Sequence, residues 1–105
     1  LQLLANTGKL VKISELDMGY GDKNGNTLHA SQLTDQQHRV MADYYRFIVR
    51  KYFEIVPPAQ QYGITHWCIA DPESGWRALE PVGLWDANYN RKYAYAGFAD
   101  GLRGK

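Results

Sequence analysis

The sequence has a single cysteine, no long hydrophobic run and almost no excess of charge. Cys68 by itself cannot form a disulfide within the chain or supply a cysteine-based metal site. No apolar stretch approaches the length of about 20 residues that crosses a bilayer, so no membrane-spanning segment is predicted. The net charge of +1 gives no basic patch, and no nucleic-acid partner is expected.

Several functional motifs are also missing. No glycine-rich turn joins a strand to a helix in the pattern of a phosphate loop or a dinucleotide fingerprint, which argues against kinases and dehydrogenases. His29, His38 and His66 fall on a predicted loop, helix and strand, without a carboxylate at the spacing of helical metal ligands. We therefore expect neither a metal nor a cofactor.

Two strand-like segments are present, and each ends in an acidic residue. Val11 and Ile13 alternate with Lys12 and a serine, which is typical of a strand, and Glu15 lies at its carboxyl end before a glycine-containing loop. Residues 63–71 predict a second strand that again ends in an acid. Strands that are separated by a helix are expected to pair in parallel, and enzymes of the barrel class carry their chemistry at the carboxyl ends of such strands.

The segment between the two strands predicts a long loop followed by a helix. Residues 18–33 are rich in Gly, Asn, Asp, Ser and Thr, as in surface loops. Thr34 and Gln37 have the spacing of a capping box, and apolar residues recur at helical spacing until Pro57 and Pro58. This apolar face is expected to pack on the sheet.

The order and spacing of several segments resemble one known family. The segments are residues 13–17 (Ile-Ser-Glu-Leu-Asp), 66–71 (His-Trp-Cys-Ile-Ala-Asp), 74–77 (Ser-Gly-Trp-Arg), 83–86 (Gly-Leu-Trp-Asp) and 92–95 (Lys-Tyr-Ala-Tyr). They are similar to the nucleophile strand, the last strand, its substrate loop and the closing helix of family 10 glycoside hydrolases, the retaining endo-β-1,4-xylanases. One departure is Cys68, where members of the family usually have glycine.

The resemblance implies an α/β fold, the TIM (β/α)8 barrel, which needs roughly 250 residues. With 105 residues, the chain is expected to be the C-terminal portion of a single glycoside hydrolase catalytic domain, holding about the seventh and eighth strand-helix units. Residues 1–4 fit the end of a helix already under way. The N-terminal segment of the same barrel, on a separate or cleaved chain, is the expected partner.

The resemblance also implies the chemistry. Glu15 matches the nucleophile of a double displacement, and the acid/base Glu would come from the fourth strand, outside residues 1–105. Asp17 shares its side of the strand but lies on the same wall, so we expect it to accept hydrogen bonds from loop amides or a basic side chain. The plain alternative for Glu15 is a salt bridge, for example with Arg77.

Three residues are predicted to contact the substrate, xylan or a xylo-oligosaccharide. The resemblance places Trp67 at the floor of the cleft and Trp76 on the loop above it, on the glycone side, where an indole packs well on a sugar ring. Arg77 is expected to hydrogen-bond a sugar hydroxyl or to orient Glu15, or else to form an ion pair with Asp71 or Glu73. His66 is interpreted as a hydrogen-bonded structural residue rather than an acid or base.

Two alternatives remain open from the sequence. The first is a non-catalytic carbohydrate-binding barrel fragment, although such a module has no need of Glu15. The second is a β-1,4-glucanase of the same fold, because the choice between xylan and glucan depends on steric room around C5 of the sugar. A polymeric substrate does not enter a cell intact, so the family implies an extracellular, cell-surface or periplasmic location.

Overall fold

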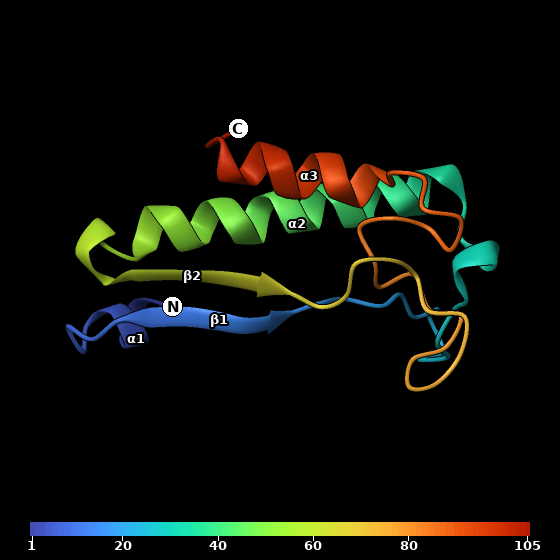
Figure 1. Cartoon of the computed structure of the whole chain (residues 1–105), viewed down its shortest axis with the longest axis horizontal. Coiled ribbons are helices and arrows are strands. Elements are labelled where there is room, and N and C mark those ends of the chain that lie inside the picture. Colours follow the sequence, from blue (N-terminus) through green and yellow to red (C-terminus); the bar gives the residue numbers. More distant parts are fainter.

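The computed structural model describes residues 1–105, and its centre is a two-stranded parallel sheet. Strand β1 (Val11–Leu16) pairs with β2 (Gln61–His66), with Ile13 opposite Ile64 and Leu16 opposite His66. The two arrows point the same way in Figure 1. The register is irregular between Ile13 and Leu16. This confirms the predicted parallel pairing of two strands.

The second strand is shorter than the sequence predicted. The expected strand over 63–71 is correct only as far as His66, where β2 ends. Beyond it, Ala70 forms an isolated parallel bridge with Trp85, and the backbone N–H groups of Leu84 and Trp85 both donate to the Ile69 carbonyl at 3.0 Å. The chain therefore leaves the sheet because its backbone groups pair with a later loop.

Helix α2 (Asp35–Ile55) forms as its capping signals predict. The Thr34 side chain accepts a hydrogen bond from the backbone N–H of Gln37, and the Gln37 side chain accepts one from the N–H of Thr34. The helix ends before Pro57 and Pro58, which cannot continue it. Short helices α1 (Gln2–Ala5), η1 (Ala30–Gln32) and η2 (Pro58–Gln60) accompany it, and α3 (Tyr93–Leu102) closes the chain. None of the helices is long and apolar enough to span a membrane.

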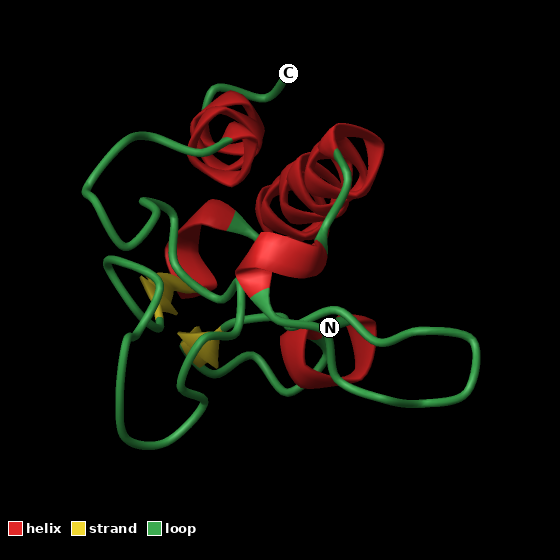
Figure 2. Cartoon of the chain, turned by 90° about the vertical axis from the view of Figure 1, so that its right-hand side faces the viewer, coloured by secondary structure: helices red, strands yellow, loops and turns green.

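Helices α2 and α3 lie on the same side of the sheet (Figures 1 and 2). The core under α2 holds two small clusters, which consist of Leu16, Tyr45, Val49 and Ala94, and of Val11, Tyr52 and Val56. The buried Tyr52 hydroxyl donates to the Val11 carbonyl at 2.6 Å and accepts from the Gly63 N–H at 3.0 Å. The prediction that an apolar stripe of α2 packs on the sheet is confirmed for Tyr45 and Tyr52, whereas Val40 and Tyr44, which share its helical spacing, are exposed.

The opposite face of the sheet is open. Lys12 is exposed there, and its ammonium group lies 5.4 Å from the ring centroid of Tyr62, which is 65% exposed. In a parallel α/β barrel one face of the sheet packs against helices and the other faces the interior. The arrangement is the one expected of two adjacent strand-helix units of a barrel.

Helix α3 approaches α2 closely at two glycines. A Cβ atom on Gly97 would lie 2.1 Å from the carbonyl oxygen of Ala42, and one on Gly101 would lie 2.8 Å from the Cβ of Val49. Both distances are far below van der Waals contact. Glycine at position 97 therefore sets the separation of the two helices.

We expect Gly97→Ala to destabilise the folded protein by about 1–3 kcal/mol, as overpacked core substitutions do. Intrinsic helix propensity alone would favour alanine by about 1 kcal/mol, so the sign of the effect reports the contact with Ala42. Urea unfolding measures it. Ala96→Gly, on the exposed side of α3, is the control for propensity. A Gly97→Ala protein more stable than the parent would contradict the packing argument.

Candidate active site

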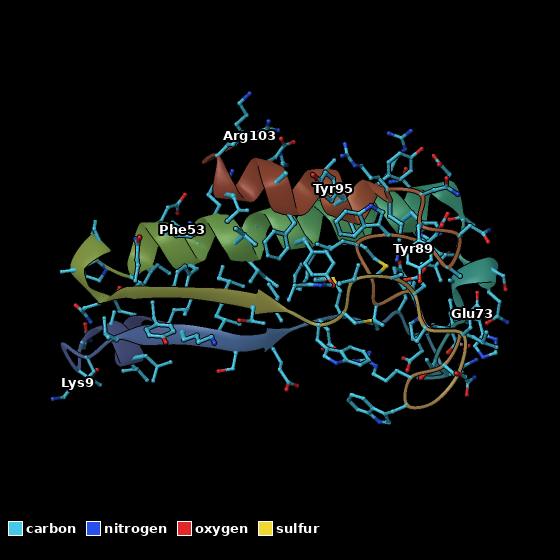
Figure 3. All side chains as sticks on the ribbon, viewed as in Figure 1. Lys9, Phe53, Glu73, Tyr89, Tyr95 and Arg103 are labelled. Atoms are coloured by element: carbon cyan, nitrogen blue, oxygen red, sulfur yellow. The ribbon has the colours of Figure 1, made fainter.

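Long loops gather at the carboxyl ends of β1 and β2, at the right of Figure 1. They comprise residues 17–34 and 67–92, and they hold most of the side chains that the sequence singled out. In Figure 3 the labelled side chains of Glu73 and Tyr89 lie at this end of the molecule. The candidate site is therefore at the edge of the sheet where parallel α/β enzymes place their chemistry.

Glu15 lies near the end of β1 with its side chain exposed. No hydrogen bond or ion pair within residues 1–105 engages its carboxylate, and Arg77 pairs with Asp17 and Glu80 instead. The alternative interpretation, a salt bridge between Glu15 and Arg77, is therefore wrong. The carboxylate is available to a ligand on the open side of the strand end.

Asp17 and Arg77 form an ion pair between the segment that follows β1 and the loop over residues 67–92. Arg77 Nη1 donates to Asp17 Oδ2, and its Nε donates to Glu80 Oε2 at 3.1 Å. The expectation that Asp17 accepts from a basic side chain is confirmed. The alternative pairing of Arg77 with Asp71 or Glu73 is wrong, because the carboxylates that Arg77 contacts are those of Asp17 and Glu80, and Asp71 pairs with Lys92.

The charged form of the Arg77 guanidinium is stabilised by its two carboxylate partners. Burial opposes ionisation, but the hydrogen bond to Glu80 and the charge of Asp17 outweigh it and raise the pKa of the guanidinium. Glu80 was not singled out in the sequence. Its spacing of three residues from Arg77 was the only local signal.

Trp67 and Trp76 lie against each other, with ring centroids 5.4 Å apart and planes at 61°. Trp67 is half-buried, whereas Trp76 is 73% exposed. The guanidinium carbon of Arg77 lies 5.6 Å from the Trp76 ring centroid. The structure thus joins the three predicted substrate residues in one group, which presents an exposed indole to solvent.

A buried ion pair supports the loop behind this group. Lys92 Nζ lies 2.8 Å from Asp71 Oδ1 and also donates to the carbonyls of Pro81 and Gly83, at 3.1 and 2.9 Å. The same Asp71 oxygen accepts from the Gly83 N–H at 2.8 Å. The two side chains are 7% and 5% exposed. No local sequence signal identified this pair, because its partners are 21 residues apart.

His66 and Cys68 are structural. The Tyr45 hydroxyl and His66 Nε2 are 3.0 Å apart, and burial lowers the pKa of His66 to about 4, against the opposing charge of Asp17. His66 is therefore neutral and hydrogen-bonded near pH 7, as expected. Burial also raises the pKa of the Cys68 thiol, whose Sγ lies 3.2 Å from the Ala70 carbonyl oxygen. A protonated thiol is a poor nucleophile.

No group of three or more His, Cys, Asp or Glu side chains is arranged to hold a metal ion. The site is instead built from one free carboxylate, two indoles and an ion-paired guanidinium. Over residues 1–101 the chain matches the profile described as glycosyl hydrolase family 10. The chain belongs to this family.

Two curated relatives come from Cellvibrio japonicus. Endo-1,4-beta-xylanase A is 32% identical over an alignment of 111 residues. The alignment covers 90% of this chain and 17% of the relative. Endo-beta-1,4-xylanase Xyn10C is 31% identical over an alignment of 117 residues. This alignment covers 99% of this chain and 19% of the relative. The chain thus spans less than a fifth of the length of each.

Solved structures give the same placement within the family. A mutant of xylanase 10C from Cellvibrio japonicus in complex with xylopentaose superimposes with a TM-score of 0.84 at 29% identity, covering 99% of this chain and 23% of that one. Xylanase B from Clostridium stercorarium shares the fold, with a TM-score of 0.73 at 22% identity. The fold of this family 10 chain is therefore that of a part of a TIM barrel.

Proposed function

We propose that the chain is the C-terminal portion of the catalytic domain of a retaining endo-β-1,4-xylanase and that Glu15 is its nucleophile. The observation that carries the proposal is the free carboxylate of Glu15 at the carboxyl end of β1, within a chain that matches family 10 along residues 1–101. The indoles of Trp67 and Trp76, which pack against each other, supply a surface on which a sugar ring can pack.

The reaction has two displacements at the anomeric carbon. In the first, the Glu15 carboxylate forms a bond to that carbon while the bond to the leaving sugar oxygen breaks, and the acid/base carboxyl protonates this oxygen. In the second, the acid/base carboxylate removes a proton from water. The oxygen of this water forms a bond to the anomeric carbon as the bond between that carbon and Glu15 breaks. The acid/base residue belongs to the rest of the barrel, which is the partner that the chain needs.

Substrate contacts follow from the exposure of the aromatic pair. Trp76 is 73% exposed and can cover one face of a xylose ring, while the half-buried Trp67 packs against it. Arg77 lies beside them, either as a contact to a sugar hydroxyl or as a residue that orients the site. The substrate is xylan or a xylo-oligosaccharide, and no cofactor is required. Because xylan is a polymer, the enzyme works outside the cytoplasm, in the medium, at the cell surface or in the periplasm.

The test is covalent trapping of the nucleophile. The enzyme that contains this chain and the remaining strands is incubated with a 2-deoxy-2-fluoro-xylobioside that carries a good leaving group, and its intact mass is recorded. We expect an increment of one fluoro-xylobiosyl group, mapped by peptide mass spectrometry to Glu15. The Glu15→Gln protein is the control and should show no increment.

Other outcomes identify the alternatives. A folded enzyme that binds xylopentaose without being labelled would favour a non-catalytic carbohydrate-binding protein. Labelling by the corresponding cellobioside at a higher rate than by the xylobioside would favour a β-1,4-glucanase. Labelling of another carboxylate would contradict the assignment of Glu15.

A further inference from the structure

Arg77 connects two segments of the site. Its guanidinium contacts Asp17, two residues after Glu15 on the segment that leaves β1, and it contacts Glu80, three residues further along its own loop, which also carries Trp76. The side chains of Arg77, Asp17 and Glu80 are 18%, 23% and 17% exposed. We call these three residues the Arg77 cluster.

The backbone around the cluster is closely packed. A Cβ atom on Gly19 would lie 2.9 Å from Arg77 Nη2 and 3.0 Å from Glu80 Oε1, so the segment after β1 runs directly against the cluster. Arg77 itself has a φ of 64°, in the left-handed region that bulky residues rarely adopt. Such a conformation persists only where surrounding contacts hold it.

Three of the five N–H donors of the guanidinium are already engaged by carboxylates. Nε and Nη2 both face Glu80, at 3.1 and 3.4 Å, and Nη1 donates to Asp17. A guanidinium is a planar fork whose donors point in fixed directions, so two carboxylates bound on different edges fix its plane. Trp76 is the residue before Arg77, so the contacts that fix the backbone of Arg77 also restrict the position of Trp76.

We infer that Arg77 is a positioning residue for the reaction, which ties the Trp76 loop to the end of β1 through Asp17 and Glu80 and thereby sets the sugar platform relative to Glu15. This inference rests on the proposed function and chooses between the two roles left for Arg77. In this role the residue does not contact the sugar. Glu80 acts only by holding Arg77.

The experiment is a double-mutant cycle in the complete enzyme. The variants are Arg77→Gln, Glu80→Gln, the double variant and Arg77→Lys, with Arg103→Gln as a control at an exposed arginine, 63% accessible and paired with Asp100 at the end of α3. The readout is kcat/KM on an aryl β-xylobioside per active site. Active sites are counted by the burst of aryl group that the fluoro-xylobioside releases, so loss of folded protein does not enter the rate.

We expect Arg77→Gln to lower kcat/KM by about 10- to 100-fold, as small misplacements of a bound substrate do. Glu80→Gln should lower it in the same direction, and the double variant should be no slower than Arg77→Gln, because Glu80 has no other task. Arg77→Lys should not restore the rate, since an ammonium cannot bridge both carboxylates. Arg103→Gln should match the parent.

Three results would overturn the inference. An unaffected Glu80→Gln beside a slow Arg77→Gln would make Arg77 a direct sugar contact. Multiplicative losses in the double variant would make the two residues independent. A normal rate per active site in Arg77→Gln, with only a lower unfolding midpoint, would make the cluster purely structural. A parent enzyme without activity or labelling would remove the proposed function itself, and that is known before any variant is made.

Discussion

Replacing Glu15 with alanine is expected to lower kcat on xylan by a factor on the order of 10⁴ to 10⁶, which is the range for removal of a nucleophile. The substitution removes the carboxylate that is proposed to attack the anomeric carbon. It leaves no buried charge behind, because the Glu15 side chain is exposed and has no partner within residues 1–105. The free energy of unfolding should therefore stay within about 0.5 kcal/mol of the parent.

Added azide should restore part of the activity of Glu15→Ala. The anion fits the space that the carboxylate vacates and attacks the anomeric carbon from the same face, so the product is a glycosyl azide of inverted configuration. Chromatography and NMR of the product measure this. Glu54→Ala, at an exposed carboxylate on α2, is the matched control and should keep the parent rate. A fully active Glu15→Ala enzyme would end the nucleophile assignment.

Replacing Lys92 with methionine is expected to destabilise the fold by about 3–5 kcal/mol, the cost of breaking a buried ion pair from one side. Methionine fills a similar volume but leaves the Asp71 carboxylate without its cation. The carbonyls of Pro81 and Gly83 also lose the donor that joins them. The loop that carries Trp76 begins and ends on this network, so activity on xylan should fall with stability.

Lys51→Met is the matched control for Lys92→Met. Lys51 forms an ion pair of the same length with Glu54, 2.8 Å, but the two side chains are 39% and 46% exposed. Exposed pairs contribute little, so this variant should unfold in urea as the parent does. The double variant Asp71→Asn with Lys92→Met should recover part of the loss, since no uncompensated charge remains. Equal effects of Lys51→Met and Lys92→Met would show that the burial of the Asp71–Lys92 pair has no consequence.

Local patterns predicted the main elements. The alternation around Ile13, the capping box of Thr34 and Gln37, and the prolines after α2 act within a few residues, and the structure contains β1, α2 and a parallel pairing with β2. The order of the matched segments indicated the family, which the profile match over residues 1–101 confirms. The roles of Glu15, Trp67, Trp76 and Arg77 stay predictions until the labelling and mutant experiments are done.

Other features could not be predicted because they depend on distant parts of the chain. The second strand was expected to continue to residue 71, but Ile69 pairs with the loop around Trp85 and ends it early. One of the roles considered for Arg77 is an ion pair with Asp71 or Glu73. In the structure its partners are Glu80, on the same loop, and Asp17, 60 residues away in sequence.

The sequence by itself therefore determined where β1 and α2 begin, that the two strands are parallel, and which carboxylate lies at the end of the first strand. These follow from short-range sterics, capping and hydrophobic periodicity. Only the tertiary structure decided that Glu15 is free while Asp17 is paired, that Lys92 neutralises Asp71, and that Trp76 rests against Trp67. The energies of ion pairs and ring contacts depend on distance and on desolvation in the folded chain. Spacing along the sequence does not give those distances.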